Sequence, residues 1–339
     1  MIVAFKRMIS KMISKMIVLA RTCLILRLVL CLSGLLIGGF CPRVLASQPQ
    51  FNFDNIGAEQ GLGNVGVLKI LQDRQGFIWV ATEGGLYRYD GYDFKVFKHD
   101  PEDETSLADN VIYSLFEDSH GSLWVGTAAV LHRYNAVEGI FSRFAFAKDD
   151  ISSSASNSIV FSIIQDENTL WIATFGAGIH RFDIEQQRFI GAYRHDPHDP
   201  NSLSDDRVYT ILQDREGVLW AGTRNGGLNR FDSSNEKFKH YQHDPDNSTS
   251  LSHNRVYALL EDKSGTVWVG TRGGGLNRLS HQNRHSGVFQ HYRYDANDPA
   301  SLGSDHVRAI FADKAGSLWV GADNGGVNRF DPVTQRFAR

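Results

Sequence analysis

The sequence of 339 residues has no cysteine after position 41 and no methionine after position 16. Without cysteine, the rest of the chain can form no disulfide, thiolate nucleophile or cysteine-ligated metal centre. The first 46 residues have no acidic residue but seven basic ones, which leaves 28 basic and 38 acidic residues for the remainder. This acidic remainder lacks the clustered positive charge that non-specific nucleic-acid binding needs, so we expect no nucleic-acid partner.

The first 46 residues have the order of a secretory signal peptide. An uncharged apolar run at 28–41 follows scattered lysines and arginines, and Val44 and Ala46 are small enough for a signal peptidase. The run is short for a membrane-spanning helix, which needs about 20 apolar residues, and Arg21 and Arg27 prevent its extension. We therefore expect cleavage after Ala46, with an uncleaved anchor as the alternative.

A repeat governs the chain after residue 50. Its six tryptophans recur every 45 to 51 residues, at Trp79, Trp124, Trp171, Trp220, Trp268 and Trp319. Each copy holds four short runs rich in β-branched and aromatic residues, which in the fifth copy lie at 256–262, 266–271, 275–279 and 289–294. Four-strand units at this spacing are typical of propeller blades. The sequence therefore predicts an all-β β-propeller over 47–339, with six four-stranded blades present.

The most repetitive residues have structural explanations. Asp-x-x-Gly before each tryptophan predicts a tight turn, except that the third copy reads DENT and must turn differently. The tryptophan is expected to pack between neighbouring blades. An arginine recurs in each third strand, and we expect it to pair with turn carboxylates: Arg88, Arg133, Arg181, Arg230, Arg278 and Arg329.

The string D-x-x-G-x-[LVI]-W-[VI]-G-T followed by G-G-L-x-R-[FY]-D resembles the two-component regulator propeller repeat, over about residues 51 to 339. That family builds the periplasmic sensor region of bacterial hybrid histidine kinases and related signalling proteins. The resemblance implies a periplasmic, ligand-binding sensor module that is not itself catalytic. It further implies a C-terminal transmembrane signalling region, absent from these 339 residues, and homodimerisation of the full-length protein.

Two segments bear on whether the ring is complete. Residues 51–53 resemble a donated outer strand, yet the sixth copy supplies its own fourth segment at 336–339. Because a propeller closes by sharing one such strand, this redundancy favours a chain cut within a propeller of seven or more blades. The alternative is a six-bladed ring in which one of the two segments stays unpaired.

The loops between second and third strands vary where the rest of the unit repeats. Variation at positions that the fold does not dictate marks a candidate ligand-binding face. Polar, charged and aromatic side chains there could bind a small polar ligand or an oligosaccharide, and a solvated rim without ligand is the alternative. The candidate residues are Glu83, Phe175, Arg224, Asn225, Arg272, Asp323 and Asn324.

No cofactor is expected, although calcium is a minor alternative in the acidic loops at 244–248 and 295–299. His99, His195 and His243 recur blade by blade, so they should not converge on one metal ion. His281 and His285 lie in a polar insertion and are expected to be solvated.

Two other classes of function remain open. A secreted propeller hydrolase or lyase acting on polysaccharide would need two carboxylates in one cleft, for which Glu83 and Asp323 are the candidates. A protein-interaction scaffold would need no pocket at all. No nucleophile–base pair marks an active site in the sequence, so we expect a binding protein rather than an enzyme.

Overall fold

The computed structural model describes residues 56–339 apart from 64, 129 and 147–157. Within these residues, 24 strands and two short 3-10 segments, η1 (Ala58–Gln60) and η4 (His281–Asn283), make up the secondary structure. The strands form six four-stranded antiparallel sheets, which confirms the predicted blades. The expected signal peptide and the segment at 51–53 lie outside the described residues.

Each sheet is one blade, and its strands pair in chain order. Blade 1 comprises β1 (Val67–Gln72), β2 (Ile78–Thr82), β3 (Gly85–Tyr89) and β4 (Phe94–Phe97). Blade 2 comprises β5 (Ser114–Glu117), β6 (Leu123–Gly126), β7 (Val130–Asn135) and β8 (Ile140–Ala145). Blade 3 comprises β9 (Ile159–Asp166), β10 (Thr169–Phe175), β11 (Ile179–Asp183) and β12 (Arg188–Tyr193). Blade 4 comprises β13 (Val208–Gln213), β14 (Leu219–Thr223), β15 (Leu228–Asp232) and β16 (Lys237–Tyr241). Blade 5 comprises β17 (Val256–Glu261), β18 (Val267–Thr271), β19 (Leu276–Leu279) and β20 (Gln290–Tyr292). Blade 6 comprises β21 (Val307–Ala312), β22 (Leu318–Ala322), β23 (Gly326–Asp331) and β24 (Arg336–Ala338).

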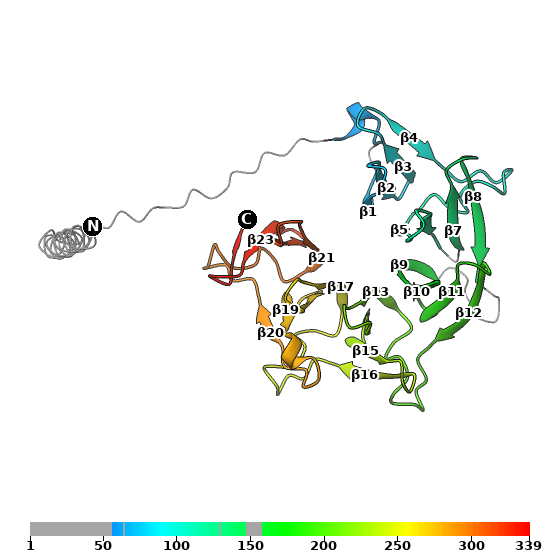
Figure 1. Ribbon diagram of the computed structural model, residues 1–339. Helices are drawn as coiled ribbons and strands as arrows, with labels where there is room; N and C mark the ends of the chain where they lie inside the picture. The colour runs from blue at the N-terminus through cyan, green and yellow to red at the C-terminus, as the bar shows by residue number, and fades with distance from the viewer. Residues whose placement is uncertain (1–55, 64, 129, 147–157) are drawn as a thin grey trace, which may run out of the picture. The chain divides into compact units, whose positions relative to one another are not determined.

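Successive blades contact one another through their first strands, β1 with β5, β5 with β9, β9 with β13, β13 with β17 and β17 with β21. Figure 1 shows these strands on the inner side of the blades and fourth strands such as β8, β12 and β16 on the outer side. This arrangement of radially repeated sheets is a β-propeller. The inner strands of different blades therefore lie next to one another, although they are far apart in sequence.

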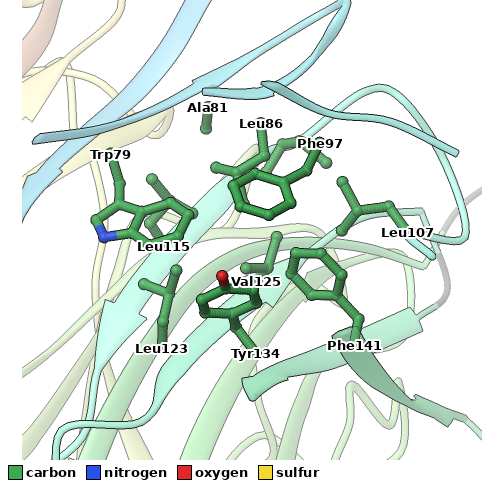
Figure 2. Close-up of a cluster of buried hydrophobic side chains, with 11 residues drawn as sticks. Trp79, Ala81, Leu86, Phe97, Leu107, Leu115, Leu123, Val125, Tyr134 and Phe141 are labelled. Atoms are coloured by element: carbon green, nitrogen blue, oxygen red, sulfur yellow. The ribbon is translucent and has the colours of Figure 1, made fainter. Parts of the chain in front are cut away.

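The hydrophobic core lies between blades. Figure 2 shows one of the buried clusters, in which Trp79 of blade 1 packs with Leu115, Leu123 and Tyr134 of blade 2. The rings of Trp79 and Tyr134 meet edge to face with their centroids 5.3 Å apart. This confirms the packing predicted for the repeated tryptophan. Four further tryptophans pack in the same way against the blade that follows their own: Trp124, Trp171, Trp220 and Trp268.

The Asp-x-x-Gly turn also fixes the tryptophan. In blade 5, Asp262 Oδ1 accepts the backbone N–H groups of Ser264 and Thr266, at 2.8 and 3.1 Å. Its Oδ2 accepts the indole N–H of Trp268 at 2.7 Å, and blades 1, 2, 4 and 6 make the same indole bond at 2.7 to 3.0 Å. The third repeat turns differently, as predicted: only residues 167 and 168 separate β9 from β10, and Glu167 has φ 49°.

The arginines of the third strands pack on tryptophan. The guanidinium carbon lies 5.7 to 5.9 Å from the centroid of the tryptophan ring of its own blade in Arg88, Arg133, Arg181, Arg230 and Arg329. Within the described residues, no ion pair joins Arg88, Arg133, Arg181 or Arg230 to a carboxylate. For these four, the predicted pairing with turn carboxylates is wrong. The indole face attracts the cation because the ring quadrupole is negative there.

Blade 5 carries an insertion between β19 and β20. His281 and His285 are exposed in it, as predicted, but Arg284 between them is only 3% exposed. Arg284 Nη1 donates to Asp214 Oδ2 of the preceding blade at 2.7 Å, and Nη2 donates to Glu261 Oε1 at 2.5 Å. The insertion therefore ties blades 4 and 5 together through a buried cation.

One face of blade 1 and one face of blade 6 are more exposed than the equivalent faces of the other blades. Val67 on β1 is 45% exposed, whereas the equivalent residues are fully buried: Ile112, Val160, Val208, Val256 and Val307. Val327 on β23 is 55% exposed, whereas its equivalents are fully buried: Leu86, Leu131, Ile179, Leu228 and Leu276. Among the described residues, nothing covers these two positions as the neighbouring blade covers the others. Propeller closure with seven or more blades stays a prediction.

Candidate functional site

The variable residues lie in loops that the fold holds in one place. In blade 5 the backbone N–H of Arg272 donates to the carbonyl of Arg255, at the start of the inner strand, at 2.9 Å. Equivalent bonds of 2.8 to 3.1 Å join Glu83 to Gly66, Arg224 to Arg207 and Asp323 to His306. Gly275 follows at φ +73°, where an added β-carbon would lie 2.3 Å from the carbonyl oxygen of Tyr292. Hydrogen bonds thus hold the backbone of each loop in place, whereas the fold does not dictate which residue type stands at the first position of the loop.

A row of aromatic rings runs along the inner strands of blades 2 to 5. Tyr113, Phe161, Tyr209 and Tyr257 occupy the same repeat position, and successive ring centroids are 5.5, 5.3 and 4.7 Å apart. In blade 6 this position is Arg308, whose guanidinium carbon lies 4.6 Å from the centroid of the Tyr257 ring. We call these five residues the inner row. Sequence reasoning missed the inner row, although an aromatic residue after the first apolar residue of four inner strands was a visible signal.

Four of the predicted residues join the inner row. The ring of Phe175 lies 5.9 Å from that of Phe161, and Arg224 lies over Phe175 at 5.4 Å. Arg272 Nη1 donates to the hydroxyl of Tyr257 at 3.2 Å. The carboxylate of Asp323 accepts a hydrogen bond from Arg308 Nε at 2.8 Å. Loops of blades 3 to 6 therefore deliver their variable side chains to one continuous surface.

The other three predicted residues contact groups of their own blades, and Glu83 also acts on the inner row: burial and the charges of Asp109 and Glu83 raise the pKa of Tyr113. The carboxylate of Glu83 lies beside Gly66 of its own blade, 2.9 Å from where a β-carbon on that glycine would stand. The backbone N–H of Asn225 donates to Asp205 Oδ2 at 3.0 Å, and Asn324 has φ 58°, so both shape their loops. The structure describes no contact between Glu83 and the carboxylate of Asp323.

Positive charge surrounds the two tyrosines at the blade 5 end of the inner row. Burial raises the pKa of Tyr209, and the neighbouring Tyr257 raises it further. Burial acts in the same direction on Tyr257, but the hydrogen bond from Arg272 and the charges of Arg308 and Arg272 outweigh it, so the pKa of Tyr257 is lowered. Two adjacent phenols are thus shifted in opposite directions, because the hydrogen bond between them raises the pKa of Tyr209 and lowers that of Tyr257, which also accepts a hydrogen bond from Arg272.

The loops between blades use their polar groups internally. His99, His195 and His243 each place Nδ1 2.7 to 2.9 Å from a leucine carbonyl oxygen within the same loop. In the loop at 244–248, Asp244 Oδ1 and Asn247 Oδ1 accept backbone N–H groups at 3.0 Å. In the part of the chain that the structure describes, no group of three or more His, Cys, Asp or Glu side chains is arranged to hold a metal ion. The expectations of no cofactor and of calcium as a minor alternative both stay predictions.

A hollow lies near the turns of blades 2 and 3. It has a volume of about 430 Å³ and is lined by residues that include His120, Arg133, Asn135 and Gln187. Arg133 Nη2 donates to Ser122 Oγ at 2.9 Å, and Asn135 Oδ1 accepts the N–H of Val137 at 3.0 Å, so these residues serve the blade. The inner row is the stronger candidate because side chains from five blades meet along it.

The fold and the inner row together define a β-propeller that presents aromatic and cationic side chains along its inner strands. Five stretches match the model of the two component regulator propeller, at 61–84, 106–129, 202–225, 250–273 and 301–324. The chain therefore carries repeats of this family, which confirms the resemblance. The third repeat, with its shortened turn, lies outside these stretches. No helix among the described residues is long and apolar enough to cross a membrane.

The chain is similar to parts of several larger proteins. Over 63 residues, or 19% of this chain and 5% of the relative, the sequence is 38% identical to the histidine kinase P4 of Formosa agariphila. The extracellular domain of the putative hybrid two component system BT3049 from B. thetaiotaomicron has a TM-score of 0.58 and 23% identity. That match covers 81% of this chain and 41% of the solved one, and it shows the fold. The extracellular domain of the putative one component system BT4673 from the same organism has a TM-score of 0.49 at 20% identity, covering 82% and 39%. The chain thus spans well under half of these relatives.

Proposed function

We propose that the propeller is the extracytoplasmic ligand-binding sensor module of a bacterial membrane signalling system, is not itself catalytic, and binds its ligand on the inner row. The observation that carries this proposal is the convergence of variable loop residues on the row. Phe175, Arg224 and Arg272 come from three different blades and all contact it or extend it. A surface that combines aromatic faces with a few polar groups is typical of ligand sites.

The relatives support the signalling part of the proposal. The chain carries two-component regulator propeller repeats, and one named relative is a histidine kinase. One solved structure with the same fold is the extracellular domain of a putative hybrid two component system. Together with the signal-like sequence of residues 1–46, these findings support a periplasmic location, with the membrane-spanning and output parts belonging to a longer protein. A homodimer of that longer protein is part of the same proposal.

The carboxylates favour binding over catalysis. A polysaccharide hydrolase or lyase would need two carboxylates that act on one bond. Asp323 is instead held in an ion pair with Arg308, and Glu83 lies beside its own inner strand. The geometry of these two groups gives the hydrolase alternative no support.

A thermal-shift screen tests the proposal, using neutral and acidic oligosaccharides and small anions. A ligand at 100 times its Kd should add about 2.7 kcal/mol to the stability, because it binds only the folded state. Tyr209→Ala and Phe161→Ala should remove this shift. Tyr92→Ala is the matched control, since Tyr92 is 86% exposed and lies outside the row. A shift that persists in both row variants would contradict the assigned site, and a screen without any shift would contradict the sensor function.

A further inference from the structure

The turn side of the propeller binds a guanidinium group at one place, between blades 4 and 5. Arg284 Nη1 donates to Asp214 Oδ2 at 2.7 Å and to Glu216 Oε2 at 3.3 Å. Its Nη2 donates to Glu261 Oε1 at 2.5 Å and to the carbonyl oxygen of Gly265 at 2.7 Å. Two of these acceptors belong to the turn of blade 4, and the other two belong to blade 5. The space between two adjacent turns can therefore hold a guanidinium group.

Blades 1 and 2 repeat this arrangement of acceptors. A cavity of about 40 Å³ has a lining that includes Asp73, Gln75, Glu117 and Gly121. These are the repeat positions of the four acceptors of Arg284: the turn aspartate, the residue two places after it, the last residue of the next blade's first strand, and the turn glycine that follows. Three of the four residue types are identical, and glutamine replaces glutamate at the remaining position. The cavity is thus the counterpart of the Arg284 site.

The paired carboxylates distinguish these two interfaces from the others. The first strand ends in glutamate in blades 2 and 5, whereas the other blades have glutamine or alanine at this position. Between blades 2 and 3, Gln165 stands there, and its side chain bonds the backbone N–H and the hydroxyl of Ser119 at 2.7 and 2.8 Å. Of the five interfaces between described blades, two therefore combine the turn aspartate with a glutamate, and one of them already holds an arginine.

Asp73 has the acceptor that a guanidinium group needs. Its Oδ2 accepts the indole N–H of Trp79 at 2.7 Å, which is its only partner among the described residues. The equivalent Asp214 Oδ2 accepts both an indole N–H at 2.8 Å and Arg284 Nη1 at 2.7 Å. Since a carboxylate oxygen has two lone pairs, Asp73 Oδ2 can accept a second donor in the same way.

Glu117 is shared with Arg74 at the edge of the cavity. Arg74 Nε lies 3.0 Å from Glu117 Oε1, and its backbone N–H donates to Oε2 at 3.0 Å. At the Arg284 site, the equivalent Arg215 keeps the backbone bond at 2.9 Å, but its Nε lies 3.9 Å from Glu261 Oε2. The side chain of Arg74 is 51% exposed, so it can move aside in the same way and leave Glu117 Oε1 to a bound group.

A neighbouring cation is common to both sites. Arg88 lines the cavity, and its guanidinium carbon lies 5.7 Å from the centroid of the Trp79 ring. The equivalent Arg230 lies 5.9 Å from the centroid of the Trp220 ring. Arg284 is bound between blades 4 and 5 although that interface has the equivalent arginine, so Arg88 does not prevent binding of a cation between blades 1 and 2.

We infer that the cavity between blades 1 and 2 binds a guanidinium group through Asp73 and Glu117. The group belongs to another molecule, as an arginine side chain of a polypeptide or as a small guanidino compound. Its planar fork of N–H donors suits two carboxylates better than an ammonium group does. A volume of about 40 Å³ exceeds the roughly 10–15 Å³ that a water molecule needs, and so admits one small head group. The turns lie at the opposite strand ends from the variable loops, so this inference does not rest on the proposed function.

Calorimetric titration of the protein with three blocked amino acids tests the inference: Nα-acetylarginine amide, Nα-acetylcitrulline amide and Nα-acetyllysine amide. Citrulline has the shape of arginine without its charge, and lysine has the charge without the planar fork. The arginine probe should bind about ten-fold more tightly than the citrulline probe and about three-fold more tightly than the lysine probe. Its affinity should fall as the salt concentration rises, because charged contacts are screened.

Two variants and one control locate the contact. Glu117→Gln removes one carboxylate and should weaken the arginine probe about ten-fold. Gln75→Glu supplies the carboxylate that Glu216 provides at the Arg284 site and should tighten the arginine probe about three-fold. Because Gln75 is exposed, this second variant keeps the test decisive if Glu117→Gln impairs folding. Glu102→Gln, at an exposed position in the loop between β4 and β5, should leave the affinity unchanged.

Methylguanidinium and a blocked Gly-Arg-Gly peptide distinguish the two sources of the group. Tighter binding of the peptide supports an arginine of a polypeptide, and equal binding supports a small guanidino compound. Equal binding of the arginine and citrulline probes, or no binding of any guanidinium probe, would overturn the inference and leave the sensor function intact. An affinity that changes with neither Glu117→Gln nor Gln75→Glu would overturn it as well.

Discussion

A buried histidine makes the stability of blade 2 sensitive to acid. His132 is fully buried, its Nε2 accepts the backbone N–H of Ala108 at 3.0 Å, and its Nδ1 lies 3.2 Å from the carbonyl oxygen of Val125. This geometry requires a neutral ring, since a protonated Nε2 cannot accept. Burial accordingly lowers the pKa of His132 to about 4. In blades 4 and 5, Asn229 and Asn277 make the equivalent bonds with an amide that does not titrate.

The shift fixes the sign and the size of the effect. The unfolded chain binds a proton at His132 below a pKa of about 6.5, whereas the folded chain binds it only below about 4. Above pH 6.5 this group therefore takes nothing from the free energy of unfolding. As the pH falls from 6.5 to 4, the free energy of unfolding decreases, because the unfolded chain binds the proton first. One pKa unit corresponds to about 1.4 kcal/mol, so the loss from this group is about 2 kcal/mol at pH 5 and about 3 kcal/mol at pH 4.

His132→Asn removes this titration and keeps the two hydrogen bonds that the asparagines of blades 4 and 5 make. Urea denaturation of both proteins at pH 7.5 and pH 5 measures the effect, with the slope m checked for constancy. The parent chain should lose about 2 kcal/mol more than the variant over this range. Equal losses in the two proteins would refute the reasoning, because they would show that His132 does not titrate differently in the folded and unfolded states.

Other substitutions test the buried cation and the uncovered face. Arg284→Met should cost about 3–5 kcal/mol in urea denaturation, because it leaves Asp214 buried without its cation, whereas Arg215→Met at an exposed pair should cost less than about 1 kcal/mol. Similar costs for both would contradict the network. Val327→Thr should change the stability by less than about 0.5 kcal/mol, whereas Leu276→Thr at the equivalent buried position should cost about 2–4 kcal/mol. An equal cost at Val327 would show that this face is covered in solution.

The fold could be predicted because the same local signals recur six times. The strands expected in the fifth copy at 256–262 and 266–271 are observed at Val256–Glu261 and Val267–Thr271. The turn aspartate accepts a hydrogen bond from the tryptophan six residues later, so the repeated spacing of these two residues in the sequence reflects a direct contact. Repetition also separated residues that serve the blade from those that do not. The prediction therefore included Phe175, Arg224, Arg272 and Asp323, which lie at the inner row, and ligand binding by them stays a prediction.

The failures arose where contacts join distant parts of the sequence. Arg284 contacts Asp214, 70 residues away, from an insertion present in one blade, so no repeat pattern could indicate it. The aromatic residues of the inner row looked like ordinary strand residues, because their packing against the next blade is invisible along the chain. Four of the third-strand arginines contact a ring rather than a carboxylate, and composition cannot distinguish these partners. They are Arg88, Arg133, Arg181 and Arg230.

The most direct test of the proposed site is a crystal structure of the propeller with the tightest ligand of the thermal-shift screen bound. We expect density along the inner row, with a polar group of the ligand within hydrogen-bond distance of Arg272. Density confined to the outer strands, or to the hollow beside Arg133 and Gln187, would contradict it.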